Sequence, residues 1–189
     1  ASLGAGHAWG AMATYDISRL RTRIAADGMD YKGYNIAVHE FGHNVEQTIT
    51  INDVDNYMMC GVPSTAFSEA LAFVFQKRDL ELLGYKNTDP KAVALQALDI
   101  FWGSYEIMGV SLVDIYTWRW LYENPNATVA QLKETIIRNA QEVWNKYYAP
   151  VLGHENSTIL AIYSHMIEIP LYLPNYPYGH IVESQLEAQ

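Results

Sequence analysis

Two histidines stand four residues apart, with a glutamate directly after the first, in the stretch YNIAVHEFGHNVEQTI, residues 34–49. On an α-helix, residues i and i+4 lie one above the other, with Cβ atoms about 5–6 Å apart. His39 and His43 can therefore bind one zinc ion through nitrogens at about 2.0–2.1 Å. Glu40 is turned by about 100° around the helix, so it can touch a water held on the same metal. This H-E-x-x-H spacing predicts two ligands and a general base.

The neighbours of this motif predict that its helix is buried. They are mostly apolar: Ile36, Ala37, Val38, Phe41 and Val45. Unpaired polar groups are costly in such a setting. A lone histidine is more often structural than a metal ligand, but here the three positions that a metal site requires coincide on one helix, which favours the metal site. Gly42 costs about 1 kcal/mol against alanine in mid-helix. We therefore expect it to permit the close approach of a ligand or of backbone.

A third protein ligand is expected, because a catalytic zinc takes three and leaves the fourth position open. Glu69 is the strongest candidate, since a carboxylate within TAFSEALAFVF has no reason to be buried unless a positive group meets it. The alternative is that Glu69 points to solvent from an amphipathic helix. Glu46, seven residues after His39, is better suited to a contact behind the ligands. The other candidates are His7, Asp53, Asp55 and Glu106.

Other chemistries have less support in the sequence. A carboxylate-bridged di-iron site needs a second Glu-x-x-His, which the chain lacks, and no G-x-S-x-G nucleophile motif occurs. A net charge of -9 and twelve scattered Lys and Arg residues argue against nucleic acid as a partner. No run approaches the roughly eighteen apolar residues of a membrane span. We therefore expect neither nucleic acid nor a membrane among the partners.

Length and composition fit a soluble, single helical domain over residues 1–189, which would bury about two-thirds of the surface of the unfolded chain. The one cysteine, Cys60, cannot form an internal disulfide and is predicted to be a small buried hydrophobe. The compartment is unknown, either cytoplasmic or periplasmic. Because the chain begins at Ala1 without methionine, we expect a piece of a longer parent.

Most segments have helical period, so the fold class is predicted to be mainly α. Proline excludes a helix interior from IPLYLPNYPYGH, residues 169–180, and a weak alternation at 48–53 is the best strand signal. An Asn87–Pro90 cap and a Thr128–Gln131 capping box mark two helix starts. Besides the helix of the histidines, helices are predicted over 12–27, 64–84, 89–105, 110–122, 128–148 and 157–167 and from 179.

VHEFGH, the glutamate within PSTAFSEALAFVFQ and the C-terminal SHMIEIPLYLPNYPYG together resemble the thimet oligopeptidase and oligoendopeptidase F family of zinc metallopeptidases. The likeness spans roughly residues 30–183. It implies a zincin-like helical domain of a two-lobed enzyme with a deep cleft, which cleaves short peptides with one zinc. His39, His43 and Glu69 would bind the ion, as in gluzincins, and Glu40 would activate water. Family members are far longer, so an N-terminal lobe of the parent is an expected partner.

The same resemblance implies substrate contacts from the C-terminal stretch. His165 and Tyr176 would face the substrate carbonyl, with Tyr172 close by. Pro177 and Tyr178 depart from the family's spacing, so the choice among the three tyrosines stays open. A neutral donor on the developing oxyanion is chemically reasonable, because losing one typically costs about 2.7–4 kcal/mol. Each tyrosine can equally be a packing residue, since the chain holds fourteen.

The sequence therefore predicts a zinc-dependent metallopeptidase that hydrolyses oligopeptides, with Glu40 as general base on zinc-bound water. The alternative is a catalytically inactive module that contains zinc and binds peptides or has only a structural role. A peptide substrate is the partner expected in the first case.

Overall fold

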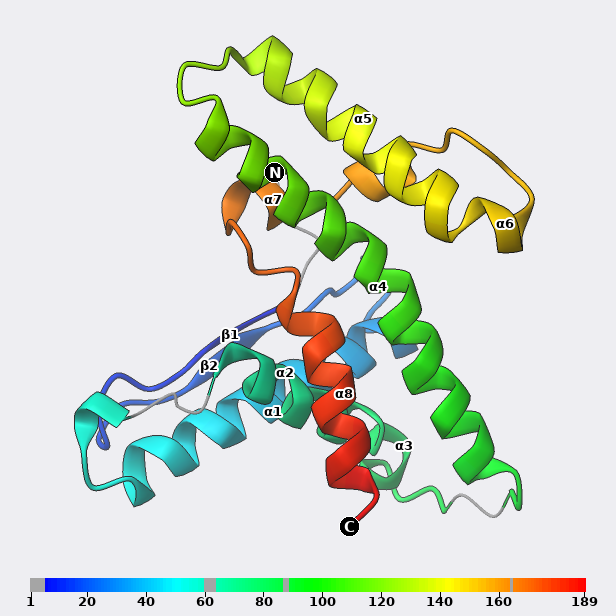
Figure 1. Cartoon of the computed structure of the whole chain (residues 1–189). Helices are drawn as coiled ribbons and strands as arrows, with labels where there is room; N and C mark the ends of the chain where they lie inside the picture. Colours follow the sequence, from blue (N-terminus) through cyan, green and yellow to red (C-terminus); the bar gives the residue numbers. More distant parts are fainter. Residues whose placement is uncertain (1–5, 60–63, 87–88, 164) are drawn as a thin grey trace. The chain divides into compact units, whose positions relative to one another are not determined.

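Helices form most of the structure, as the helical periods predict. The computed structural model describes residues 6–59, 64–86, 89–163 and 165–189, so Cys60 and the predicted cap residues Asn87 and Thr88 lie outside it (Figure 1). None of the described helices is long and apolar enough to cross a membrane. In chain order the elements are β1 (His7–Trp9), β2 (Arg19–Arg21), α1 (Tyr31–Asp53), η1 (Tyr57–Met59), α2 (Thr65–Gln76), α3 (Asp79–Leu82), α4 (Ala92–Glu123), α5 (Val129–Tyr147), α6 (Ala149–Leu152), η2 (Ile159–Ala161), α7 (His165–Glu168) and α8 (Asn175–Glu187).

The backbone divides into two compact units. The first contains Ala1–Leu98 and Tyr178–Gln189, and the second contains Asp99–Pro177. Helix α4 begins in the first unit and lies mostly in the second, whereas α8 begins in the second and lies mostly in the first. That residues 1–189 act as a single domain stays a prediction.

The first unit is built around α1, which packs along α2 and against the antiparallel pair β1 and β2 (Figure 1). Its start is set by Asp30, whose side chain accepts a hydrogen bond from the backbone N–H of Gly33 at 2.7 Å. Ser64 caps α2 in the same way by accepting from the N–H of Phe67 at 3.4 Å. Such caps satisfy donors that a helix cannot pair internally, so Asp30 and Ser64 stabilise the starts of α1 and α2.

Gly42 lets α1 and α2 approach closely. A Cβ atom added at Gly42 would lie 2.8 Å from Cα of Ala72 and 3.0 Å from Cβ of Phe75. These neighbours belong to helix α2 and cannot move aside as a flexible side-chain tip can. The expectation that Gly42 admits backbone is confirmed, and the contact brings the histidines of α1 next to α2.

The helix predicted over residues 12–27 is wrong. This segment forms a turn and strand β2, whose Leu20 pairs with Ala8 of β1. The carboxylate of Asp16 accepts hydrogen bonds from the N–H groups of Met12 at 3.2 Å and Ile17 at 2.8 Å, a local arrangement that competes with helix formation. Met12 and Ile17 are 74% and 69% exposed, so the apolar face that suggested a helix buries little.

The second unit has its own core, in which α5 folds back along α4 after a short turn (Figure 1). The predicted capping box at Thr128 and Gln131 is present at the start of α5. The buried cluster of this core consists of Val110, Val113, Ala140, Val143, Tyr148, Leu160, Met166 and Leu173. Burying one large aliphatic side chain, such as a valine or a leucine, stabilises a fold by about 1.5–3 kcal/mol.

Several helix limits differ from the predicted ones. Residues 48–53 belong to α1, and the helices predicted over 89–105 and 110–122 are one helix, α4. The stretch 157–167 contains only η2 and the start of α7 among its described residues. Helix α8 begins at Asn175 rather than 179, because Pro177 lies in its first turn, where a helix needs no N–H donor.

Candidate metal centre

Helices α1 and α2 bring three metal-binding side chains together. Among the described residues, His39, His43 and Glu69 each offer one donor atom, and these atoms lie within 4.8 Å of one another. Oε2 of Glu69 lies 3.4 Å from Nε2 of His39, and Oε1 lies 3.7 Å from Nε2 of His43. The three residues predicted as ligands thus form one cluster that is close enough to hold a metal ion.

The donor set fits zinc. Imidazole nitrogen and carboxylate oxygen bind zinc at about 2.0–2.2 Å, so two ligands of one tetrahedral ion stand about 3.3–3.5 Å apart. The distances of 3.4 and 3.7 Å from Glu69 to the histidines are close to that separation. Two imidazoles with one carboxylate are a ligand set of catalytic zinc sites, which keep a fourth position open.

Glu69 is buried by its surroundings in the first unit. It is 1% exposed, so the alternative that it points to solvent is wrong. A Cβ atom added at Gly179 of α8 would lie 3.0 Å from Cβ of Glu69 and 3.2 Å from the ring of Phe73. The Phe73 ring stacks on His180 at 4.0 Å between centroids and lies 5.2 Å from the His39 ring. An apolar wall of this kind strengthens electrostatic interactions inside the site.

The Nδ1 atoms of both histidines have partners, which leaves Nε2 for a metal. Nδ1 of His39 lies 3.0 Å from Oε1 of Gln76. Nδ1 of His43 lies 3.1 Å from Oγ of Ser68, which donates to Oε2 of Glu46 at 3.4 Å. Such contacts orient ligating imidazoles and set their tautomers. The prediction that Glu46 lies behind the ligands is confirmed, whereas the sequence pattern did not single out Ser68 and Gln76.

The two histidines differ in their electrostatic environment. Burial disfavours the charged form of His39, but the nearby Glu69 and Glu40 carboxylates outweigh it and raise the pKa of His39. Burial lowers the pKa of His43, with the attraction of Glu69 opposing this and the repulsion of His39 and His7 adding to it. His43 is therefore held in the neutral form, which is the form that binds metals.

Glu40 is the remaining acidic group of the centre. Its side chain is almost buried, at 8% exposure. A Cβ atom added at Gly6 would lie 2.5 Å from its Oε1, so the segment before β1 covers the carboxyl group. Burial raises the pKa of Glu40 to about 7, with His39 opposing the shift and Glu69 adding to it. A carboxyl group that titrates near neutral pH is suited to accept and return a proton.

The raised pKa makes Glu40 a source of pH-dependent instability in the metal-free protein. Its pKa is about 7 in the folded chain against an ordinary value of 4.5, so its favourable contribution is complete below about pH 4.5 and is lost as the pH rises to about 7. We expect metal-free Glu40→Gln to gain about 1–2 kcal/mol over wild type between about pH 5 and pH 8, a figure reduced for partial contact with water. Urea unfolding of both proteins in the presence of a chelator measures this difference in unfolding free energy.

The exposed Glu134 on α5 provides the control for that measurement. Glu134→Gln should have nearly the unfolding free energy of wild type, because it alters only an exposed side chain. A Glu40→Gln advantage that stays flat or shrinks with rising pH contradicts the assignment of the raised pKa.

The other residues predicted at the site lie in the second unit. The rings of His165 and Tyr172 are 6.0 Å apart, those of His165 and Tyr176 6.2 Å, and those of the two tyrosines 5.6 Å. The structure thus brings the three residues into one aromatic group. Their predicted contact with the substrate carbonyl stays a prediction.

The alternative third ligands are not part of the cluster. His7 lies in β1 with its ring 4.5 Å from Trp9, and Asp53 and Asp55 are exposed at the end of α1 and beyond it. Glu106 is exposed in the second unit. Glu69 is therefore the carboxylate that meets the two histidines.

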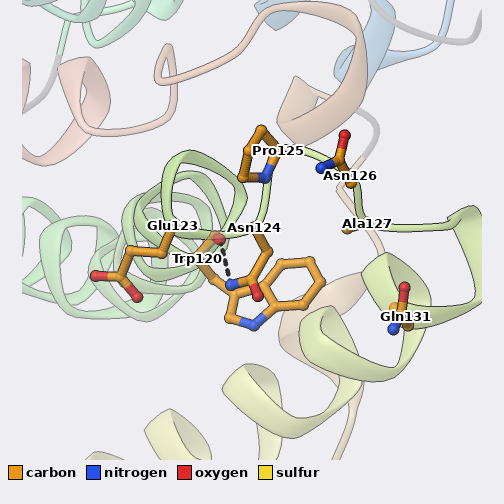
Figure 2. A pocket seen from close by; sticks show the side chains of 7 residues that line it. All are labelled: Trp120, Glu123, Asn124, Pro125, Asn126, Ala127 and Gln131. Atoms are coloured by element: carbon orange, nitrogen blue, oxygen red, sulfur yellow. Dashed lines mark hydrogen bonds between the residues drawn. The ribbon is translucent and has the colours of Figure 1, made fainter.

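A separate pocket of about 320 Å³ lies in the second unit, at the turn between α4 and α5 (Figure 2). Within it, the side-chain amide of Asn124 donates to the backbone carbonyl of Trp120 at 2.9 Å. Its lining has one carboxylate, Glu123, and no histidine or cysteine. The lining residues are Trp120, Glu123, Asn124, Pro125, Asn126, Ala127 and Gln131. We assign this pocket no catalytic role.

Comparison with known proteins gives no match to a protein-family model, to a curated protein or to a solved structure. The chemistry of the cluster on α1 and α2 is therefore the basis for assigning a function.

Proposed function

We propose that this chain is the catalytic part of a zinc metallopeptidase that hydrolyses peptide bonds in oligopeptides. The observation that supports this most is the cluster of His39, His43 and Glu69, whose donor atoms lie within 4.8 Å of one another beside the buried Glu40. The resemblance of the motifs to the thimet oligopeptidase and oligoendopeptidase F family supports the same reaction and the same substrate class.

In this proposal each group of the centre has one task. His39, His43 and Glu69 would hold the ion. When bound, zinc supplies Lewis-acid chemistry that makes water nucleophilic near neutral pH and polarises a carbonyl group. Glu40 would take a proton from the attacking water and later deliver it to the leaving amine, a task that its pKa of about 7 suits.

Charge that develops on the substrate oxygen needs a further donor. We propose His165 and the hydroxyl of Tyr176 or Tyr172 for this role, on the basis of the family resemblance. A preorganised neutral donor of this kind is typically worth about 2.7–4 kcal/mol in the transition state.

Zinc content and peptide turnover test the proposal together. Elemental analysis of the purified chain should give one zinc per molecule, and quenched-fluorescence oligopeptides should be cleaved at internal bonds. A chelator should abolish cleavage, and added zinc should restore it. Zinc without turnover would favour the inactive peptide-binding module, and the absence of zinc would leave only a structural helical domain.

A further inference from the structure

The hydrogen bond of His39 to Gln76 is the first link of a longer polar chain within the first unit. Nε2 of Gln76 donates to Oδ1 of Asn35 at 2.6 Å. Nδ2 of Asn35 donates to Oδ2 of Asp79 at 2.7 Å. The chain connects α1, the last residue of α2 and the first residue of α3. It joins an imidazole of the metal centre to a carboxylate three hydrogen bonds away.

The carboxylate end determines the direction of every link. An ionised Asp79 can only accept hydrogen bonds, so Asn35 must present its NH₂ group to it. Asn35 then has only its carbonyl oxygen for Gln76, which must present its own NH₂ group in turn. The oxygen of Gln76 is left facing His39, so Nδ1 of His39 carries a proton, and in the neutral imidazole Nε2 then keeps its lone pair.

The buried carboxylate of Asp79 accepts several hydrogen bonds. It is 4% exposed. The hydroxyl of Tyr31 donates to its Oδ2 at 2.7 Å, and the N–H of Leu80 donates to its Oδ1 at 2.5 Å. The hydroxyl of Tyr34 donates to its backbone oxygen at 2.8 Å. The hydrogen bond to Asp79 raises the pKa of Tyr31 to about 12, as an acceptor with negative charge does.

We propose that Asp79 is a positioning residue of the metal centre: through Asn35 and Gln76 it selects the tautomer of His39 that presents Nε2 to the metal. This inference rests on the proposed zinc site for its purpose, although the tautomer itself can be measured without metal. Groups behind a ligating histidine typically change metal affinity by 10–100-fold. Asp79 is expected to change metal affinity by a similar factor, although it lies three hydrogen bonds away from His39.

Asp79→Asn should reverse the direction of each hydrogen bond from residue 79 through Asn35 and Gln76 to His39. The N–H of Leu80 requires an acceptor, so the new amide would turn its oxygen there and present its NH₂ group to Asn35. Asn35 and Gln76 would both flip, and Gln76 would donate to Nδ1 of His39. His39 would then carry its proton on Nε2, the atom that the metal needs.

The experiment measures the tautomer of His39 by ¹⁵N NMR on zinc-free protein, at a pH at which the ¹⁵N shifts show the imidazole to be neutral, and zinc affinity by competition with a chromophoric chelator. Wild type should show the Nδ1–H form. Asp79→Asn should shift His39 to the Nε2–H form and weaken zinc binding by about 10–100-fold. His43 should keep its tautomer in both, since Ser68 is its partner.

Two variants make the result specific. Asp27→Asn, at an exposed position, should change neither measurement. Asn35→Asp combined with Asp79→Asn places a carboxylate at position 35, which is one hydrogen bond nearer to His39. Gln76 would then again donate to a carboxylate, so the Nδ1–H tautomer of His39 and the zinc affinity should return. An unchanged His39 tautomer in Asp79→Asn, or a double variant as defective as the single one, overturns the inference. A wild type that binds no zinc but shows the expected tautomers would instead refute the proposed function alone.

Discussion

Glu40→Gln is expected to lower kcat/KM for oligopeptide hydrolysis by about 10²–10⁴-fold while one zinc per chain is retained. The amide keeps the size of the side chain but cannot accept a proton from water. Zinc binding should persist because Glu40 is not one of the three clustered donor residues. Steady-state kinetics with quenched peptides and elemental analysis of the same samples measure the two quantities.

Glu134→Gln is the matched control, because it removes the same charge from an exposed position on α5. Its kinetics should equal those of wild type. Glu40→Gln activity within about tenfold of wild type would show that another group is the base, since general-base catalysis contributes at least about 10²-fold.

Glu69→Gln is expected to weaken zinc binding by more than about 100-fold, the upper limit of effects seen for groups behind the ligands. It replaces an anionic ligand by a neutral amide in a site where the carboxylate lies 3.4 Å from His39 and 3.7 Å from His43. Peptide hydrolysis should fall with zinc occupancy. Competition with a chelator of known affinity measures the dissociation constant.

For this substitution Glu81→Gln on α3 is the control, since Glu81 is exposed. Circular dichroism should show that Glu69→Gln keeps its helices, because the two side chains have nearly equal volume. A variant that is folded and binds zinc as tightly as wild type would mean that a different group completes the ligand set.

Local features of the sequence predicted most of the metal centre. His39 and His43 are four residues apart, and the helix alone places them on one side. Glu69 was identified because a carboxylate within an apolar helix needs a positive partner, and the structure buries it beside the histidines. Caps such as Ser64 and the Thr128–Gln131 box also act within one turn, so their helix starts were predictable.

Segments with ambiguous patterns were decided by hydrogen bonds that the pattern itself did not show. The alternation at 48–53 became the last turns of α1, where Thr48 donates to the carbonyl of Asn44 and Thr50 donates to Glu46. These bonds satisfy side chains that the pattern alone would assign to a strand. Near the predicted break before residue 110, α4 continues, and Tyr148 of the second unit accepts the N–H of Gly109 at 2.8 Å.

The tertiary structure alone revealed Ser68, Gln76 and Asp79 as polar groups behind the histidines. Gln76 and Asp79 lie 37 and 44 residues from their partners His39 and Asn35. Polar side chains of this kind occur throughout the sequence, and none has a spacing that indicates a hydrogen-bonded chain. Their roles depend on the direction of each amide, which a neighbour from another helix determines.

The sequence by itself therefore determined the helical class and identified the two histidines, the proposed base beside them and the most suitable third candidate ligand. The reason is that side chains within one helical turn have a fixed relation, and a charge in an apolar setting needs a partner. The meeting of Glu69 with the histidines, the approach of α2 to Gly42 and the link from His39 to Asp79 depended on packing between helices. Only the folded chain decides these contacts, because they join residues that no local pattern relates.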